Sequence, residues 1–266
     1  MPKVQVNGIE LDVETHGDGE PLLLIAGFAC DHTTWSDVVG ALAGHYRVIV
    51  FDNRGVGRSA APDSPCTIRM MAGDAAALLD EIGVGQVHVA GYSMGGQIAQ
   101  ELALARPAQV RSLMLLSSCA RCDERNKAIM QTWAELPGVV EPRLLARVLL
   151  PWLYSNAFFT RAGAVEQLLT LLLDNRYPPT PEGIYHQSRA LGDFDTRDRL
   201  RDIGCPTLVL VGKEDALLPV AFSQQLAQGI PGAELVVLEK AGHGLLVESP
   251  EGVAQAMLAF LSRQRG

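Results

Sequence analysis

The sequence lacks any long apolar run. The apolar stretch around Leu208–Val211 has the length of a strand, far short of the roughly 20 residues that a helix needs to cross a bilayer. Residues Met1–Gly8 alternate polar and apolar side chains and contain no apolar core of the kind that a secretory signal carries. We therefore expect a cytoplasmic protein with no membrane partner.

Positive charge is also scarce. The 266 residues include 22 lysines and arginines against 30 aspartates and glutamates, which gives a net charge of −8. Because no dense stripe of basic side chains is available to bind a phosphate backbone, we expect no nucleic-acid partner.

Cysteine is sparse, with five residues that cannot all pair with one another. Cys119 and Cys122 have the spacing of a redox or zinc motif, but no second pair of cysteines or histidines accompanies them. Thiols in the cytoplasm stay reduced. The sequence therefore predicts no metal site and no cofactor.

What the sequence does contain is a regular alternation of strand and helix patterns. Asn7-Gly8 joins two alternating stretches in the manner of a two-residue hairpin. Continuous apolar runs, typical of strands buried on both faces, then alternate with helical patterns. The expected strands are 21–26, 47–51, 86–90, 110–116, 205–212 and 234–238, and the expected helices are 34–43, 68–81, 97–106, 220–228 and 250–263. This order predicts an α/β fold with a mostly parallel, doubly wound sheet.

Strand patterns are missing between residues 121 and 200, where helical pieces are interrupted by prolines. We expect this segment to be a helical cap inserted into a core formed by residues 1–120 and 201–266. The cap is rich in bulky apolar side chains, and we expect most of them to pack onto the core. They include Trp133, Leu144, Leu145, Trp152, Leu153, Phe158, Phe159 and Leu168–Leu173.

The sequence Gly91-Tyr92-Ser93-Met94-Gly95-Gly96 stands between an expected strand and an expected helix. A serine on such a sharp turn has strained backbone angles, and glycines two residues before and after it avoid collisions. The turn presents the hydroxyl at a helix N-terminus, where free N–H groups favour negative charge. We therefore expect Ser93 to be a nucleophile and the Met94 N–H to be one donor of an oxyanion hole.

A serine nucleophile needs a base, and the base needs a group that orients it. His243 and Asp215 are the candidates, because each follows an expected strand and the carboxyl ends of parallel strands meet at one edge of a sheet. His32 and His186 are expected at most to line the pocket.

The remaining site residues come from the loop after residue 26 and from apolar side chains near the site. Gly27 allows a close backbone approach, so we expect the Phe28 N–H to be the second oxyanion donor. An apolar pocket for substrate is expected under the cap. Its expected lining is Trp133, Trp152, Leu217 and Leu218.

Four motifs, in this order along the chain, resemble those of the α/β-hydrolase superfamily. They are Asp52-Asn53-Arg54-Gly55-Val56-Gly57-Arg58-Ser59, the Gly91–Gly96 segment, Gly212-Lys213-Glu214-Asp215, and Ala241-Gly242-His243 followed by Glu248-Ser249-Pro250-Glu251. The resemblance implies an eight-stranded sheet with helices on both faces and a helical lid after the sixth strand. Members often carry His-Gly in the oxyanion loop, where this chain has Ala26-Gly27-Phe28.

The resemblance also narrows the chemistry. Relatives that open epoxides or displace halide have an aspartate at the position of Ser93, so acyl chemistry is expected here. Phe51–Gly55 and Pro151–Tyr154 look most similar to the enol-lactonase and methylesterase branch. We predict a serine hydrolase that cleaves small carboxylic esters or lactones through an acyl-enzyme intermediate. The alternatives are a carbon–carbon bond hydrolase of ring-cleavage products and a slow-turnover ligand-binding regulator, and a homodimer is left open.

Overall fold

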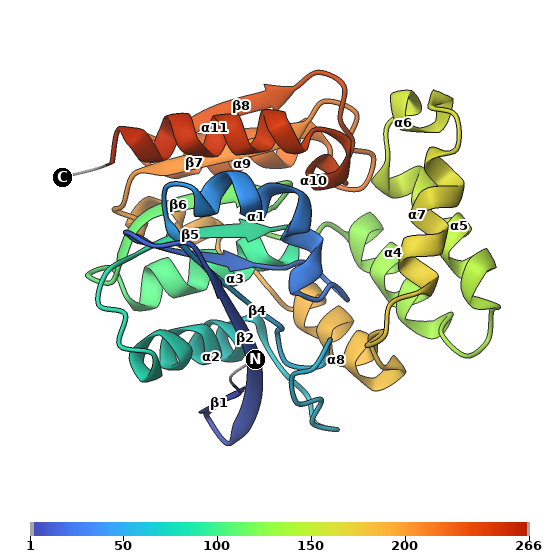
Figure 1. The fold of residues 1–266 in the computed structure, drawn as a ribbon, viewed down its shortest axis with the longest axis horizontal. Helices are drawn as coiled ribbons and strands as arrows, with labels where there is room; N and C mark the ends of the chain where they lie inside the picture. The colour runs from blue at the N-terminus through green and yellow to red at the C-terminus, as the bar shows by residue number, and fades with distance from the viewer. Residues whose placement is uncertain (1–2, 265–266) are drawn as a thin grey trace.

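An eight-stranded sheet runs through the computed structural model, which describes residues 3–264 (Figure 1). The strands are β1 (Lys3–Val6), β2 (Ile9–His16), β3 (Pro21–Ile25), β4 (Arg47–Phe51), β5 (Val87–Tyr92), β6 (Val110–Leu116), β7 (Thr207–Gly212) and β8 (Glu234–Leu238). Their order across the sheet is β1-β2-β4-β3-β5-β6-β7-β8. β2 pairs antiparallel with β1 and with β4, and all other pairs are parallel. The predicted α/β fold with a mostly parallel sheet is confirmed.

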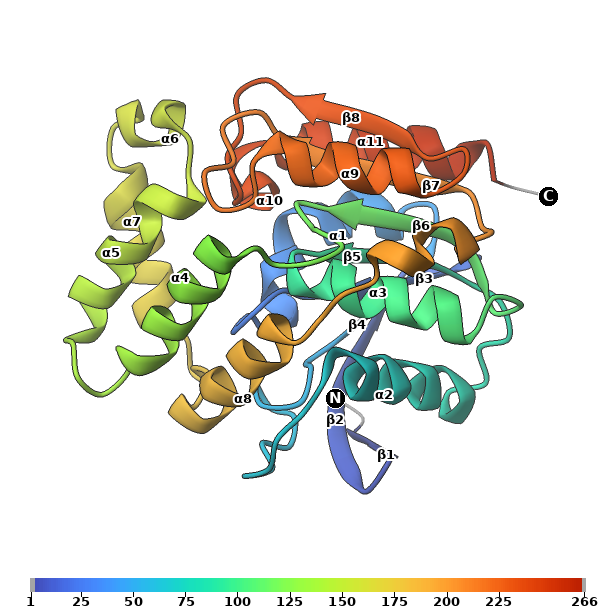
Figure 2. The ribbon, with the colours of Figure 1, turned by 180° about the vertical axis from the view of Figure 1, so that it is seen from behind.

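Helices cover both faces of the sheet (Figures 1 and 2). One face carries α1 (Ser36–Ala43), α10 (Leu245–Glu248) and α11 (Pro250–Ser262), and the other carries α2 (Ile68–Glu81), α3 (Met94–Ala105) and α9 (Val220–Gly229). A short 3-10 turn, η1 (His32–Trp35), precedes α1. None of the helices between residues 3 and 264 has the length and apolar character needed to span a bilayer.

The continuous apolar runs are explained by burial on both faces of the central strands. Successive side chains of a strand point to opposite faces of the sheet. In β3, Leu23 and Ile25 belong to one hydrophobic core, whereas Leu22 and Leu24 belong to the core on the other face. All four side chains are fully buried, so neither face of this strand tolerates a polar position.

Five helices are inserted between β6 and β7, and we call residues 121–200 the inserted segment. The helices are α4 (Glu124–Glu135), α5 (Pro142–Leu153), α6 (Asn156–Thr160), α7 (Ala164–Leu173) and α8 (Pro181–Gly192), followed by the 3-10 helix η2 (Arg197–Asp202). Figure 2 shows them beyond the ends of the sheet toward which the β6 and β8 arrows point. An isolated bridge between Arg121 and Asp195 brings the two ends of the segment together.

The apolar side chains of the inserted segment have three different surroundings. Leu150, Phe158, Leu168 and Leu169 form a small core of their own. Trp133 and Trp152 pack with the main core. The prediction that most of the listed side chains pack onto the core is therefore wrong. Five of them are exposed: Leu144, Phe159, Leu171, Leu172 and Leu173, at 54%, 41%, 69%, 48% and 40%. A helix that packs along one stripe leaves its opposite face in solvent.

Candidate active site

Ser93 occupies the turn between β5 and α3. Its backbone angles are φ 54° and ψ −117°, a conformation that is rare for residues other than glycine. A Cβ atom added at Gly91 would lie 2.2 Å from the Gly95 carbonyl oxygen, and one added at Gly95 would lie 2.1 Å from that of Ile25. The backbone is therefore packed so closely around the turn that only glycine fits at these two positions.

The structure brings Ser93, His243 and Asp215 together from three different loops. His243 Nε2 lies 3.0 Å from Ser93 Oγ, and His243 Nδ1 lies 2.8 Å from Asp215 Oδ2. The His243 and Asp215 side chains are buried, while Ser93 is partly accessible. A neutral imidazole whose Nδ1–H donates a hydrogen bond to the carboxylate has a free lone pair on Nε2 to accept the serine proton.

The Asp215 carboxylate is held by its own loop and by α4. Its Oδ1 accepts hydrogen bonds from the backbone N–H groups of Leu217 and Leu218, at 3.0 and 2.7 Å. Asn126 of α4 donates from Nδ2 to the Leu217 carbonyl at 2.6 Å. The inserted segment thus helps to orient the Asp215 carboxylate. No sequence pattern indicated the contact between Asn126 and Leu217.

The loop that carries His243 is fixed in a similar way. The Tyr92 hydroxyl donates to the His243 carbonyl at 3.1 Å, and burial raises the pKa of Tyr92 so that the phenol keeps its proton. Glu248 accepts from the Gly242 N–H at 2.7 Å through Oε1 and from the Ser155 N–H at 3.0 Å through Oε2. Glu248 therefore joins the His243 loop to the inserted segment.

The loop after β3 passes directly beside the serine. A Cβ atom added at Gly27 would lie 3.3 Å from the Ser93 Cβ atom. Met94 is the first residue of α3, so its N–H has no carbonyl acceptor in a preceding helical turn. Asn53 donates from Nδ2 to the Ala26 carbonyl at 3.2 Å and holds the start of this loop. That the N–H groups of Met94 and Phe28 bind an oxyanion stays a prediction.

The side chains expected to form the pocket belong to one apolar cluster. Phe28 and Met94, which flank the serine turn, are members of the same cluster. Its other members include Trp133, Trp152, Leu217 and Leu218. Their contact with substrate stays a prediction.

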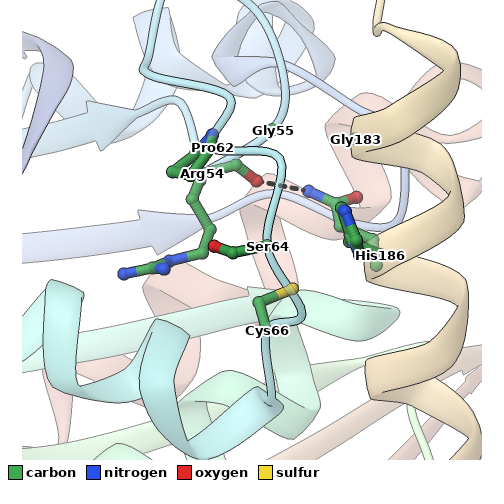
Figure 3. A pocket seen from close by; sticks show the side chains of 8 residues that line it. Arg54, Gly55, Pro62, Ser64, Cys66, Gly183 and His186 are labelled. Carbon is green, nitrogen blue, oxygen red and sulfur yellow. Dashed lines mark hydrogen bonds between the residues drawn. The ribbon is translucent and has the colours of Figure 1, made fainter.

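His32 and His186 are both engaged by carboxylates. His32 lies 2.7 Å from Asp52 through Nδ1 and 2.8 Å from Glu14 through Nε2, and the hydrogen bond to Asp52 raises the pKa of His32. His186 Nε2 lies 3.4 Å from Asp63, and its side chain borders the small cavity drawn in Figure 3. Neither contact involves Ser93.

Within residues 3–264, one group of side chains is close enough to hold a metal ion. The ligand atoms of Asp12, Glu14 and His32 lie within 4.8 Å of one another. Asp12 Oδ2 also lies 3.6 Å from Arg58 Nη1, and both nitrogens of His32 face carboxylates. These ion pairs explain why the three side chains lie close together.

Arg54 forms a buried ion pair with Asp74, at 2.6 Å through Nε and 2.8 Å through Nη2. Arg54→Met is expected to lower the free energy of unfolding by about 3–5 kcal/mol, because it leaves a buried carboxylate without its cation. Urea denaturation followed by circular dichroism measures the change. The control is Arg197→Ala, since the Arg197 side chain is 46% exposed in its pair with Asp195 and solvent screens the pair, so a much smaller loss is expected. Equal losses in the two variants would contradict the prediction.

Comparisons with known proteins identify the family to which the fold belongs. A family model described as the alpha/beta hydrolase fold matches residues 20–250. A protein of Azorhizobium caulinodans named RutD, for which carbamate hydrolysis is proposed, is 34% identical over 260 residues and 98% of each chain. A thermophilic esterase from Thermogutta terrifontis is 32% identical, with a TM-score of 0.89 over 100% of both chains. The enol-lactonase from Burkholderia xenovorans LB400 is 28% identical, with a TM-score of 0.89 over 98% of this chain and 100% of its own.

Proposed function

The chain belongs to the α/β-hydrolase family, and from this premise we propose that it hydrolyses small carboxylic esters or lactones. The observation that carries the proposal is the hydrogen-bonded series Asp215–His243–Ser93. The relatives named as an esterase and an enol-lactonase support the substrate class.

In the proposed reaction, Ser93 Oγ attacks the substrate carbonyl carbon while His243 Nε2 takes the serine proton. Asp215 holds the imidazole by its Nδ1 proton and stabilises the cation that forms. The N–H groups of Phe28 and Met94 bind the oxyanion. His243 then gives its proton to the leaving alkoxide, which departs as an alcohol, or stays attached when the substrate is a lactone. A water molecule then gives a proton to His243 as its oxygen attacks the acyl carbon. The bond between that carbon and Ser93 Oγ breaks, the carboxylic acid leaves, and His243 returns the proton to Ser93 Oγ.

The pocket proposed for the substrate is apolar. We assign Trp133, Trp152, Leu217 and Leu218 to its walls and the inserted segment to the role of a lid. Five arginines of this segment are candidates for binding a dicarboxylate: Arg121, Arg125, Arg143, Arg147 and Arg189. Three of them bind other groups, Arg121 Glu124, Arg125 the Ala216 carbonyl and Arg143 Glu166, and the side chains assigned to the pocket walls are all apolar. Uncharged acyl groups are therefore the favoured substrates over ring-cleavage dienoates.

A second candidate is a ligand-binding regulator with slow turnover. The exposed apolar side chains on α5 and α7, such as those of Leu144, Val148, Leu171 and Leu172, favour it, because they offer a surface to a protein partner. A regulator of this kind would release product once and keep an adduct on Ser93.

A substrate panel tests the proposal and separates the alternatives. p-Nitrophenyl acetate, a small enol-lactone, an N-alkyl carbamate ester and a ring-cleavage dienoate are offered at equal concentrations, and product is measured over time. Many turnovers per Ser93 with the ester or the lactone are expected. Faster turnover of the carbamate or the dienoate would replace the proposed substrate class. A burst of one equivalent, with a stable Ser93 adduct in the mass spectrum, would favour the regulator.

A further inference from the structure

A buried glutamine in the inserted segment contacts the loop beside Ser93. Gln187 lies on α8 and is fully buried. Its Oε1 accepts a hydrogen bond from the Ala29 N–H at 2.9 Å, and its Nε2 donates to the Arg54 carbonyl at 2.9 Å. The second of these bonds is the dashed line that ends on Arg54 in Figure 3. One side chain thus joins the loop after β3 to the loop after β4.

The hydrogen bond from the Ala29 N–H to Gln187 lies in a turn, Gly27–Cys30, whose backbone conformation alanine does not favour. The Cys30 N–H donates to the Gly27 carbonyl at 3.3 Å and closes a four-residue turn. Ala29, the third residue, has a φ of 56°, as in a type II turn, where glycine is the usual choice. In a type I turn the peptide between Phe28 and Ala29 is flipped, and the Ala29 N–H points elsewhere. The acceptor on Gln187 therefore selects the observed peptide orientation.

The position of Gln187 is set by close packing of α8. A Cβ atom added at Gly183, one helical turn before Gln187, would lie 2.0 Å from the Gly55 carbonyl oxygen. The helix backbone thus rests directly on the loop after β4, because neither residue has a side chain in the contact. Gln187 reaches both loops only while α8 is docked in this way.

We infer that Gln187 is a positioning residue for the oxyanion hole, which it holds in shape from the inserted segment by fixing the turn that carries the Phe28 N–H. This inference rests on the proposed function, since it assigns that N–H to oxyanion binding. Gln187 itself does not touch the reacting atoms. Its loss is expected to misplace a donor that acts in the transition state and so to lower kcat with little change in KM.

Two substitutions separate positioning from mere packing. Gln187→Met removes both hydrogen bonds and keeps the apolar volume, whereas Gln187→Glu keeps an acceptor for the Ala29 N–H but buries a charge. For p-nitrophenyl acetate, kcat is expected to fall by about 10- to 100-fold in the Met variant, a typical effect of a misplaced catalytic group. The Glu variant is expected to keep more of kcat than the Met variant while melting at a lower temperature. Ser188→Ala is the matched control, because Ser188 is buried on the same helix and binds the Met130 carbonyl.

The outcomes distinguish this inference from the proposed function. The inference is overturned if the wild type turns over the ester and kcat falls in the same order as the melting temperature, so that Gln187→Glu has a lower kcat than Gln187→Met. Gln187 would then be only a packing residue. A kcat for Gln187→Met within threefold of the wild type overturns it as well. Amide hydrogen exchange at Ala29 supplies a measurement that needs no activity: exchange is expected to accelerate at least tenfold in the Met variant and to stay unchanged in Ser188→Ala. Unchanged exchange in the Met variant contradicts the inference even if no ester is hydrolysed.

Discussion

Ser93→Ala is expected to lower kcat for p-nitrophenyl acetate by about 10⁴- to 10⁶-fold, by analogy with the loss of the serine in protease triads. The substitution removes the one oxygen that lies 3.0 Å from His243 Nε2 and that would form the acyl bond. Steady-state kinetics with active-site titration of the wild type measures the effect.

The fold should survive this change. Alanine at position 93 meets the same positive φ as serine, and among residues 3–264 the Ser93 hydroxyl has no hydrogen-bond partner other than His243. The thermal midpoint is therefore expected to stay within a few degrees of the wild type. The Ser188→Ala control, which removes a buried hydroxyl far along the chain, should keep its activity. Undiminished turnover by Ser93→Ala would refute the proposed nucleophile.

His243→Gln is expected to have the second large effect, a loss in kcat of about 10⁴- to 10⁶-fold. A glutamine amide can still form hydrogen bonds with Ser93 and Asp215, but it cannot accept the serine proton at neutral pH. In the wild type, activity should fall in acid because a protonated imidazole has no free lone pair for that proton. A pH–rate profile of both proteins measures the effect, and this acid limb should be absent from the residual activity of the variant.

His186→Gln is the matched control for this experiment. His186 belongs to the inserted segment and faces Asp63, so its replacement should leave both the rate and the acid limb in place. If the limb persisted in His243→Gln and disappeared in His186→Gln, the base would lie in the inserted segment and the assignment made from chain order would be wrong.

Local patterns in the sequence were sufficient for most of the fold. The strands Val110–Leu116 and Glu234–Leu238 and the helix Ile68–Glu81 have the bounds that their apolar patterns predict. The hairpin at Asn7 and Gly8 has positive φ at both residues, as such a turn requires. These features depend on neighbours within one helical turn or one strand, so the sequence alone is enough to locate them. The helix predicted over residues 34–43 is instead a 3-10 turn, His32–Trp35, followed by α1, Ser36–Ala43, because a 3-10 turn and an α-helix share the same sequence signals.

The members of the candidate site were also accessible from the sequence, because the carboxyl ends of parallel strands must meet at one edge of the sheet. The contacts that hold these residues in place could not be predicted from the sequence. Gln187 binds a backbone N–H 158 residues away, and Asn126 binds a carbonyl 91 residues away. A polar residue in an amphipathic helix looks the same in sequence whether it faces water or a buried loop, and the exposed leucines of α7 show the same ambiguity for apolar residues. The docking of the inserted helices on the core decides which polar and which apolar side chains are buried. Contacts between distant segments depend on how whole elements pack and not on any local pattern.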